Sequence, residues 1–210
     1  MKSKITSSDQ NRSFIETARR AQIIDCAILA IAELGYGQAS LAQIAKRAGI
    51  SAGVISYYFK GKDDLIREVV AHIYATGEAF VRPRVEGEPT ARQMLAAFVA
   101  ANIDFAGARP SYDAAMVEIN TFARASRTAP PFDRAITKTR SGPLAEILEW
   151  GQKSGEFRTF FVPIMVDTIL AAIDLHAGRL SQGADATGAE LVTLFDLATR
   201  AASPPPGASL

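Results

Sequence analysis

The sequence predicts an all-α protein of about nine helices. Two observations support this fold class: hydrophobic residues recur at helical spacing along the chain, and the alternating β-branched runs typical of strands are absent. Hydrophobic residues make up 48% of the 210 residues and charged residues 21%, which is typical of a globular domain with an ordinary core. The helices therefore have enough apolar surface to pack without disulfides, which a single cysteine, Cys26, does not allow within one chain.

Capping residues predict where the N-terminal helices begin and end. Residues 1–13 are polar and are expected to form a flexible arm. Residues 14–34 carry one apolar stripe and are followed by Gly35, a residue suited to a helix C-cap. Ser40 and Gln43 form a capping box that predicts the start of a second helix.

A third, short helix completes the N-terminal domain, residues 14–62. Gly49 ends the second helix, and Ser51 is expected to cap a helix that runs to about Tyr58. A long helix followed by two short helices joined by a four-residue turn is the spacing of a helix-turn-helix.

Residues 63–203 predict a larger helical domain, and residues 204–210 a disordered tail. One helix should end near Pro83, and Pro143 should kink or restart another. The six expected segments are 62–80, 89–107, 111–126, 130–157, 162–180 and 187–202.

Charge divides the chain unevenly. Residues 1–62 hold nine Lys or Arg and four Asp or Glu, whereas the remainder holds 14 basic and 18 acidic residues. The net charges of +5 and −4 favour an anion-binding N-terminal region on a more acidic body. No apolar run approaches the ~18 residues of a membrane span, and no signal peptide is recognisable, so we expect a cytoplasmic protein without membrane contact.

The stretch AGISAGVISYYFKGKDDL, residues 48–65, has the composition of a helix that enters a DNA groove. Ala52 and Gly53 would let the backbone approach a duplex closely, so that Val54 and Ser56 reach base edges. The longer side chains of Tyr57, Tyr58 and Lys62 suit phosphate oxygens, while Ile55 and Phe59 should face the protein core.

These residues resemble the DNA-binding region of TetR-type transcriptional regulators over residues 20–70. The shared elements are Gly35, the Ile-Ala pair at 44–45, AGIS at 48–51, Gly53, Phe59 and Lys62. The segment ISYYF, residues 55–59, further resembles the branch that contains the betaine/choline-pathway repressor. Ala39 departs from the threonine and Ser56 from the tyrosine that the family often has at these positions.

The resemblance implies a homodimeric repressor that binds a near-palindromic operator in double-stranded DNA and is released by a small molecule. The family's DNA contacts fall on Ser40, Ser51, Ala52, Gly53, Val54, Ser56, Tyr57, Tyr58 and Lys62. Two alternatives remain: an activator, and a small-molecule-binding protein whose N-terminal domain no longer binds DNA.

The larger domain should hold the effector pocket and the dimer interface. Aromatic or polar residues among apolar neighbours are the candidates for effector binding: Phe98, Asn102, Phe105, Glu118, Phe122 and Trp150. An internal salt bridge with Arg124 is the alternative for Glu118. The last two helices offer apolar residues for the dimer interface: Ile169, Leu170, Ile173, Leu191, Leu194, Phe195 and Leu197.

Nothing in the sequence favours catalysis or a cofactor. His72 and His176 do not have the spacing of a metal-ligand set. No nucleophile elbow, phosphate-binding glycine loop or Cys/His cluster is present, so we expect neither an enzyme nor a metal site.

Overall fold

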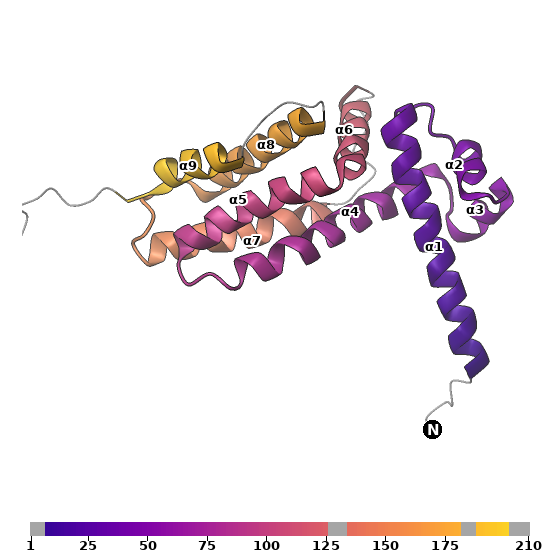
Figure 1. The fold of residues 1–210 in the computed structure, drawn as a ribbon, viewed down its shortest axis with the longest axis horizontal. Helices are drawn as coiled ribbons and strands as arrows, with labels where there is room; N and C mark the ends of the chain where they lie inside the picture. Colours follow the sequence, from indigo (N-terminus) through magenta and orange to yellow (C-terminus); the bar gives the residue numbers. More distant parts are fainter. Residues whose placement is uncertain (1–6, 126–133, 182–187, 202–210) are drawn as a thin grey trace, which may run out of the picture. The chain divides into compact units, whose positions relative to one another are not determined.

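The structure is a computed structural model that describes residues 7–125, 134–181 and 188–201. These residues form nine α-helices and one isolated bridge, between Phe157 and Arg200, which confirms the all-α prediction (Figure 1). The expected tail, 204–210, lies outside the described residues. None of the helices in the described ranges has the length and apolar character that a membrane span requires.

The chain divides into two compact units. The head unit comprises residues 1–72 and 114–132, and the body unit comprises residues 73–113 and 133–210. Helices α4 (Lys62–Val85) and α6 (Pro110–Ala125) each contribute residues to both units. The head unit therefore extends beyond the residues 14–62 expected from the sequence.

The head unit is built on three N-terminal helices, α1 (Ser7–Leu34), α2 (Leu41–Ala48) and α3 (Ala52–Tyr58). Helix α1 begins at Ser7, so residues 7–13 are helical where a flexible arm was expected. Aliphatic and aromatic side chains from all three helices and from α4 form the core; the largest are Ile23, Ile28, Ile31, Ile44, Ile55, Phe59, Leu65 and Ile66.

Local capping fixes the ends of the short helices. Ser40 Oγ accepts a hydrogen bond from the Gln43 N–H at 3.2 Å, as the capping box predicted. Gly49 ends α2 with φ 65°, a left-handed conformation that glycine adopts without steric cost. Ser51 precedes α3, but its side chain makes no capping hydrogen bond, so that part of the expectation is wrong.

In the body unit, α5 (Ala91–Ala108) packs against α7 (Arg134–Lys153), α8 (Val162–Ser181) and α9 (Gly188–Thr199), as Figure 1 shows. Their buried side chains form one core, which includes Leu95, Phe98, Val99, Leu144, Ile147, Leu148, Val166, Ile169, Ile173 and Phe195.

The helix expected to end near Pro83 does end there, whereas the fresh start that was one expectation at Pro143 does not occur. Pro83 lies in the last turn of α4, where few residues remain to be disrupted, and the helix continues to Val85. Pro143 lies inside α7, which continues through it. Leu144 and Leu148 are fully buried just after this proline, so their packing holds the helix in place.

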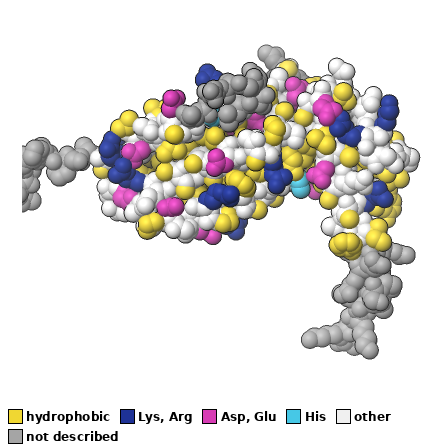
Figure 2. Space-filling view, viewed as in Figure 1, with side chains coloured by type: hydrophobic (Ala, Val, Ile, Leu, Met, Phe, Trp, Pro, Cys, Tyr) yellow, Lys and Arg dark blue, Asp and Glu magenta, His cyan; other side chains and the backbone are white. Residues whose placement is uncertain are grey.

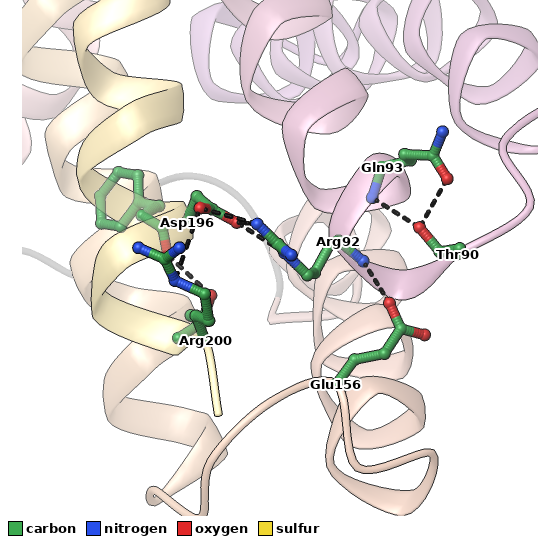
Figure 3. Close-up of polar contacts among 8 residues, drawn as sticks. Thr90, Arg92, Gln93, Glu156, Asp196 and Arg200 are labelled. Carbon is green, nitrogen blue, oxygen red and sulfur yellow. Dashed lines mark hydrogen bonds and ion pairs between the residues drawn. The ribbon is translucent and has the colours of Figure 1, made fainter. Parts of the chain in front are cut away.

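A polar network joins the start of α5 to the end of α9 (Figure 3). Arg92 donates two hydrogen bonds to Asp196, at 2.8 and 3.0 Å. Glu156 accepts from the N–H groups of Ala91 and Arg92, both at 3.2 Å, and so satisfies the free donors at the N-terminus of α5. The start of α5 and the end of α9 are thereby joined by polar contacts as well as by apolar packing.

Replacing Gly151 by alanine should destabilise the body unit by about 1–3 kcal/mol, because extra atoms in a packed core force strain. A Cβ at Gly151 would overlap the ring of Phe157, which is only 4% exposed. Gly107→Ala is the matched control: nothing lies within 4 Å of its Cβ position, so it should be neutral or stabilising. Urea unfolding followed by circular dichroism measures both, and equal stabilities would contradict the prediction.

Candidate nucleic-acid interface

Helix α3 has one buried and one exposed face. Ile55 is fully buried and Phe59 is 2% exposed, so both lock the helix against its neighbours as expected. Ser51, Ala52, Gly53 and Ser56 are exposed, and Tyr57 is 74% exposed. Val54 and Tyr58 are half-buried at the edges of this surface. The residues assigned to DNA contact on α3 therefore lie on, or border, its accessible face.

Gly53 is not required by the fold. Its φ lies outside the left-handed region, and a Cβ added there would meet only Ser51 Oγ, at an ordinary 3.7 Å. Alanine would also favour the helix by up to about 1 kcal/mol. Neither the backbone conformation nor the packing therefore requires glycine at this position. The consequence of the missing side chain is that no Cβ projects from the exposed face of α3 at Gly53.

The hydroxyl groups of Ser56 on α3 and of Ser40 before α2 each make one hydrogen bond within the protein. Ser56 Oγ donates to the carbonyl of Ala52 at 3.2 Å, which leaves its oxygen as an acceptor. Ser40 Oγ accepts from Gln43, so its own proton is available for donation. The rings of Tyr57 and Tyr58 meet edge to face, with centroids 5.0 Å apart. Tyr57 thus stands beside a ring that restricts its motion.

Arg20 of α1 positions the end of α3, a role that the sequence did not reveal. Its Nη1 donates to the carbonyl of Tyr58 at 3.0 Å, and its guanidinium lies 4.6 Å from the centre of the Phe59 ring. Its Nη2 also pairs with Glu68 of α4 at 2.9 Å. One side chain therefore joins α3 to two other helices.

Lys62 contacts the turn after α1 rather than extending into solvent. Its Nζ donates to the carbonyl of Tyr36 at 2.5 Å and lies 4.2 Å from the centre of that ring. Burial lowers the pKa of Lys62, an effect opposed by the charge of Asp63. Contact between Lys62 and a phosphate remains a prediction, and it would have to share this ammonium with Tyr36.

The basic side chains of α2 and of the segment just after α3 differ in whether they are already paired with a carboxylate. Lys46 and Lys60 are exposed, at the end of α2 and just after α3. Arg47, by contrast, pairs with Glu33. On the body unit, the face drawn in Figure 2 shows acidic and basic side chains interspersed.

The six effector candidates are divided between the two units. Glu118 and Phe122 belong to the head unit, where Glu118 Oε2 accepts from the Tyr36 N–H at 3.2 Å and the Phe122 ring stacks on Tyr36 at 4.2 Å. Glu118 thus has a backbone partner; the side chain of Arg124, its suggested partner, lies outside the described residues.

The other four candidates lie in the body unit with different surroundings. Phe98 is buried in the core, so its assignment to a ligand surface is not supported by its packing. Trp150 is 41% exposed on α7. Asn102 donates to the Phe98 carbonyl at 2.8 Å, and Phe105 lies between the rings of Phe80 and Tyr112. Only Asn102 and Phe105 share a half-buried helix face.

The dimer candidates also separate by burial. Ile169, Ile173 and Phe195 are at most 3% exposed within the core of their own unit, so they cannot supply an accessible interface. Leu170 and Leu191 are partly buried against that core. Leu194 and Leu197, on one side of α9, are 54% and 59% exposed. Ile164 and Leu175 of α8, which are 64% and 61% exposed, were not among the residues expected from the sequence.

Known proteins resemble the head most closely in sequence. Residues 23–69 match the family model for bacterial regulatory proteins of the tetR family. Residues 23–69 of the head are therefore similar to this family. The chain is 38% identical over 91 residues to the HTH-type transcriptional regulator BetI 1 of Chromohalobacter salexigens and 41% identical over 87 residues to BetI of Paraburkholderia phymatum.

These matches cover 43% and 41% of this chain and 45% and 44% of the two BetI regulators, so the chain spans less than half the length of these curated relatives. The proteins to which the head is related are regulators of transcription, not enzymes.

Solved structures of transcriptional regulators resemble this chain over most of its length. The transcriptional regulator FadR from Bacillus subtilis, in complex with stearoyl-CoA, aligns with a TM-score of 0.72 and 25% identity over 83% of this chain and 96% of its own. A TetR family regulator from Marinobacter aquaeolei aligns with a TM-score of 0.74 and 17% identity, over 90% of this chain and all of its own. The second likeness concerns the fold alone.

Arg20→Ala should destabilise the head unit by about 1–3 kcal/mol, because the Tyr58 carbonyl loses a charged donor in a half-buried setting. The exposed pair with Glu68 should add little. Arg19→Ala is the control, since Arg19 bonds to exposed Gln22 one turn away on the same helix, and a change below about 0.5 kcal/mol is expected there. Chemical unfolding distinguishes the two variants, and a neutral Arg20→Ala would disprove the positioning role.

Proposed function

We propose that the chain is a ligand-responsive transcriptional repressor whose homodimer binds a near-palindromic operator. The observation that carries the proposal is the accessible face of α3, which is flat at Gly53 although the fold accommodates alanine there. A helix that must lie close against a duplex gains from the absence of a side chain at such a position.

The residues assigned to DNA contact form two groups, those that read base edges and those that contact phosphates or allow close approach of the backbone. Val54 and Ser56 are short enough to read base edges, with the Ser56 oxygen free to accept a hydrogen bond. The residues assigned to phosphate contact or close backbone approach are Ser40, Ser51, Ala52, Gly53, Tyr57, Tyr58 and Lys62. The exposed Lys46 and Lys60 add positive charge at the ends of neighbouring elements.

Dimerisation through α8 and α9 would present two reading helices to one face of DNA. The exposed leucines of α9 lie three residues apart and so share a helix face. Apolar residues are exposed on α8 as well, and covering the apolar residues of both helices with a second copy would remove their apolar area from water.

The effector is a small molecule held by the body unit. A ligand shifts the protein between DNA-binding and released states only by its different affinity for the two states. Release therefore requires that the ligand favour a spacing of the two heads that does not fit the operator.

Gly53→Ala should weaken binding to the DNA upstream of the chain's own gene about ten- to a hundredfold, because a methyl group added at a tight contact costs about 1–3 kcal/mol. Gly107→Ala, far along the sequence on α5, should leave affinity unchanged. Fluorescence anisotropy measures binding, and circular dichroism checks that both variants remain folded.

The same titration tests the contact with phosphates. Wild-type affinity should fall by about 10³–10⁵ between 50 and 200 mM salt if the dimer neutralises roughly 6–10 phosphates. Binding by Gly53→Ala equal to wild type would reject a helix that lies close against DNA at Gly53. No wild-type binding at low salt would favour a ligand-binding protein that does not bind DNA.

The double variant Leu194→Glu, Leu197→Glu should convert the dimer to monomer, because charges on an apolar interface must be desolvated. Sedimentation velocity measures the change in mass. Asp167→Glu at an exposed position of α8 is the control and should remain dimeric. An unchanged dimer in the double variant would place the interface elsewhere, and a wild-type monomer would reject the homodimer.

A further inference from the structure

Four polar side chains from four helices come together in the body unit. Asp113 of α6 is influenced by the charges of Arg140 on α7 and Asp174 on α8, and the same two charges act on Tyr74 of α4. Arg140 donates to Asp174, and its own side chain is only 20% exposed. The Arg140 guanidinium thus lies largely buried beside an apolar core.

Asp113 has one buried carboxylate oxygen, Oδ2, that lacks a hydrogen-bond partner among the described residues. Arg140 is paired with Asp174, and it does not bond to the buried Oδ2 of Asp113. Two carboxylates therefore share one guanidinium, which leaves one negative charge uncompensated when both are ionised. An unpaired buried carboxylate is costly unless a hydrogen-bond donor or a cation is supplied.

An aromatic cluster adjoins Asp113 along the chain. The ring of Tyr112, the preceding residue, lies edge to face with Phe105 of α5 at 6.2 Å, and Phe105 lies 5.6 Å from Phe80 of α4. Arg109 already lies 5.4 Å from the centre of Tyr112 and 5.8 Å from that of Phe105. These ring faces attract cations, and they supply apolar surface for the carbon part of a ligand.

We propose that Asp113 anchors the effector site and that the effector is an organic ammonium ion with at least one N–H donor. The ammonium group donates to Asp113 Oδ2, and its carbon chain lies against Phe105 and Tyr112. This inference rests on the proposed function, because it names the ligand class to which the regulator responds. It requires a donor and not merely positive charge, since the buried oxygen lacks a hydrogen bond.

The titration of Asp113 gives the site a pH signature. Burial, reinforced by the charge of Asp174 and opposed by Arg140, raises the pKa of Asp113 to about 6. Because the folded-state pKa is raised, the ionised form is disfavoured by folding, and wild type loses stability as pH rises from about 4 to 6. Ammonium binding requires the ionised form, so affinity should fall as pH drops below 6.

The probe is hexylammonium, compared with hexanoate, which tests an anion site at Arg140, and tetramethylammonium, a cation without a donor. Binding to the full chain without DNA is measured by calorimetry at pH 7.5. Hexylammonium should bind, hexanoate and tetramethylammonium should not, and Asp113→Asn should weaken hexylammonium about ten- to a hundredfold. Asp104→Asn, an exposed carboxylate of α5, is the matched control and should bind like wild type.

A ligand-free measurement gives a second readout. Asp113→Asn should raise the melting temperature at pH 8, and this advantage should shrink towards pH 4, where wild-type Asp113 is protonated. Tighter binding of hexanoate, no binding of hexylammonium, or equal affinity in Asp113→Asn would overturn the proposal. Since none of these assays contains DNA, failure of the ammonium site is distinguishable from failure of operator binding.

Discussion

The packing behind α3 is the constraint on which the reading surface depends. A seven-residue helix is too short to be stable alone in water, so tertiary contacts must define its position. Ile55 and Phe59 supply the apolar part, and Arg20 supplies the directional part by bonding to the Tyr58 carbonyl. Small residues can then occupy the outer face because none of them is needed to hold the helix in place.

Tyr36 plays a comparable role for the turn between α1 and α2. Lys62 donates to its carbonyl, Glu118 accepts from its N–H, and Phe122 stacks on its ring. Burial, with the charge of Asp63 as the smaller cause, raises the pKa of the Tyr36 phenol. Residues from α4 and α6 are thus part of the head unit, and each helix continues into the body unit. A ligand that moves either helix in the body acts on a segment that also contacts this turn.

Most features that depend on local chemistry were predictable from the sequence, although the side-chain cap expected from Ser51 does not form. The left-handed Gly49 and the Ser40 cap depend on residues within one turn, and the buried Ile55 follows from helical spacing. Features that depend on distant partners were not. Glu118 finds its partner 82 positions away, and Ile169 and Leu194 are both aliphatic residues on largely apolar helices, where spacing alone does not distinguish the core from an exposed face.

Asp113 differs from the polar side chains described above because burial of its carboxylate lowers stability while its Oδ2 makes no hydrogen bond to any described residue in return. The Arg92–Asp196 pair, by contrast, places both partners at the surface with matched geometry. An asparagine at position 113 would be uncharged and would avoid the cost of burying a carboxylate. A fold gains nothing from that charge by itself, so its presence among four helices is explained by a partner that arrives from outside. Sites that bind ligands commonly sacrifice stability in this way.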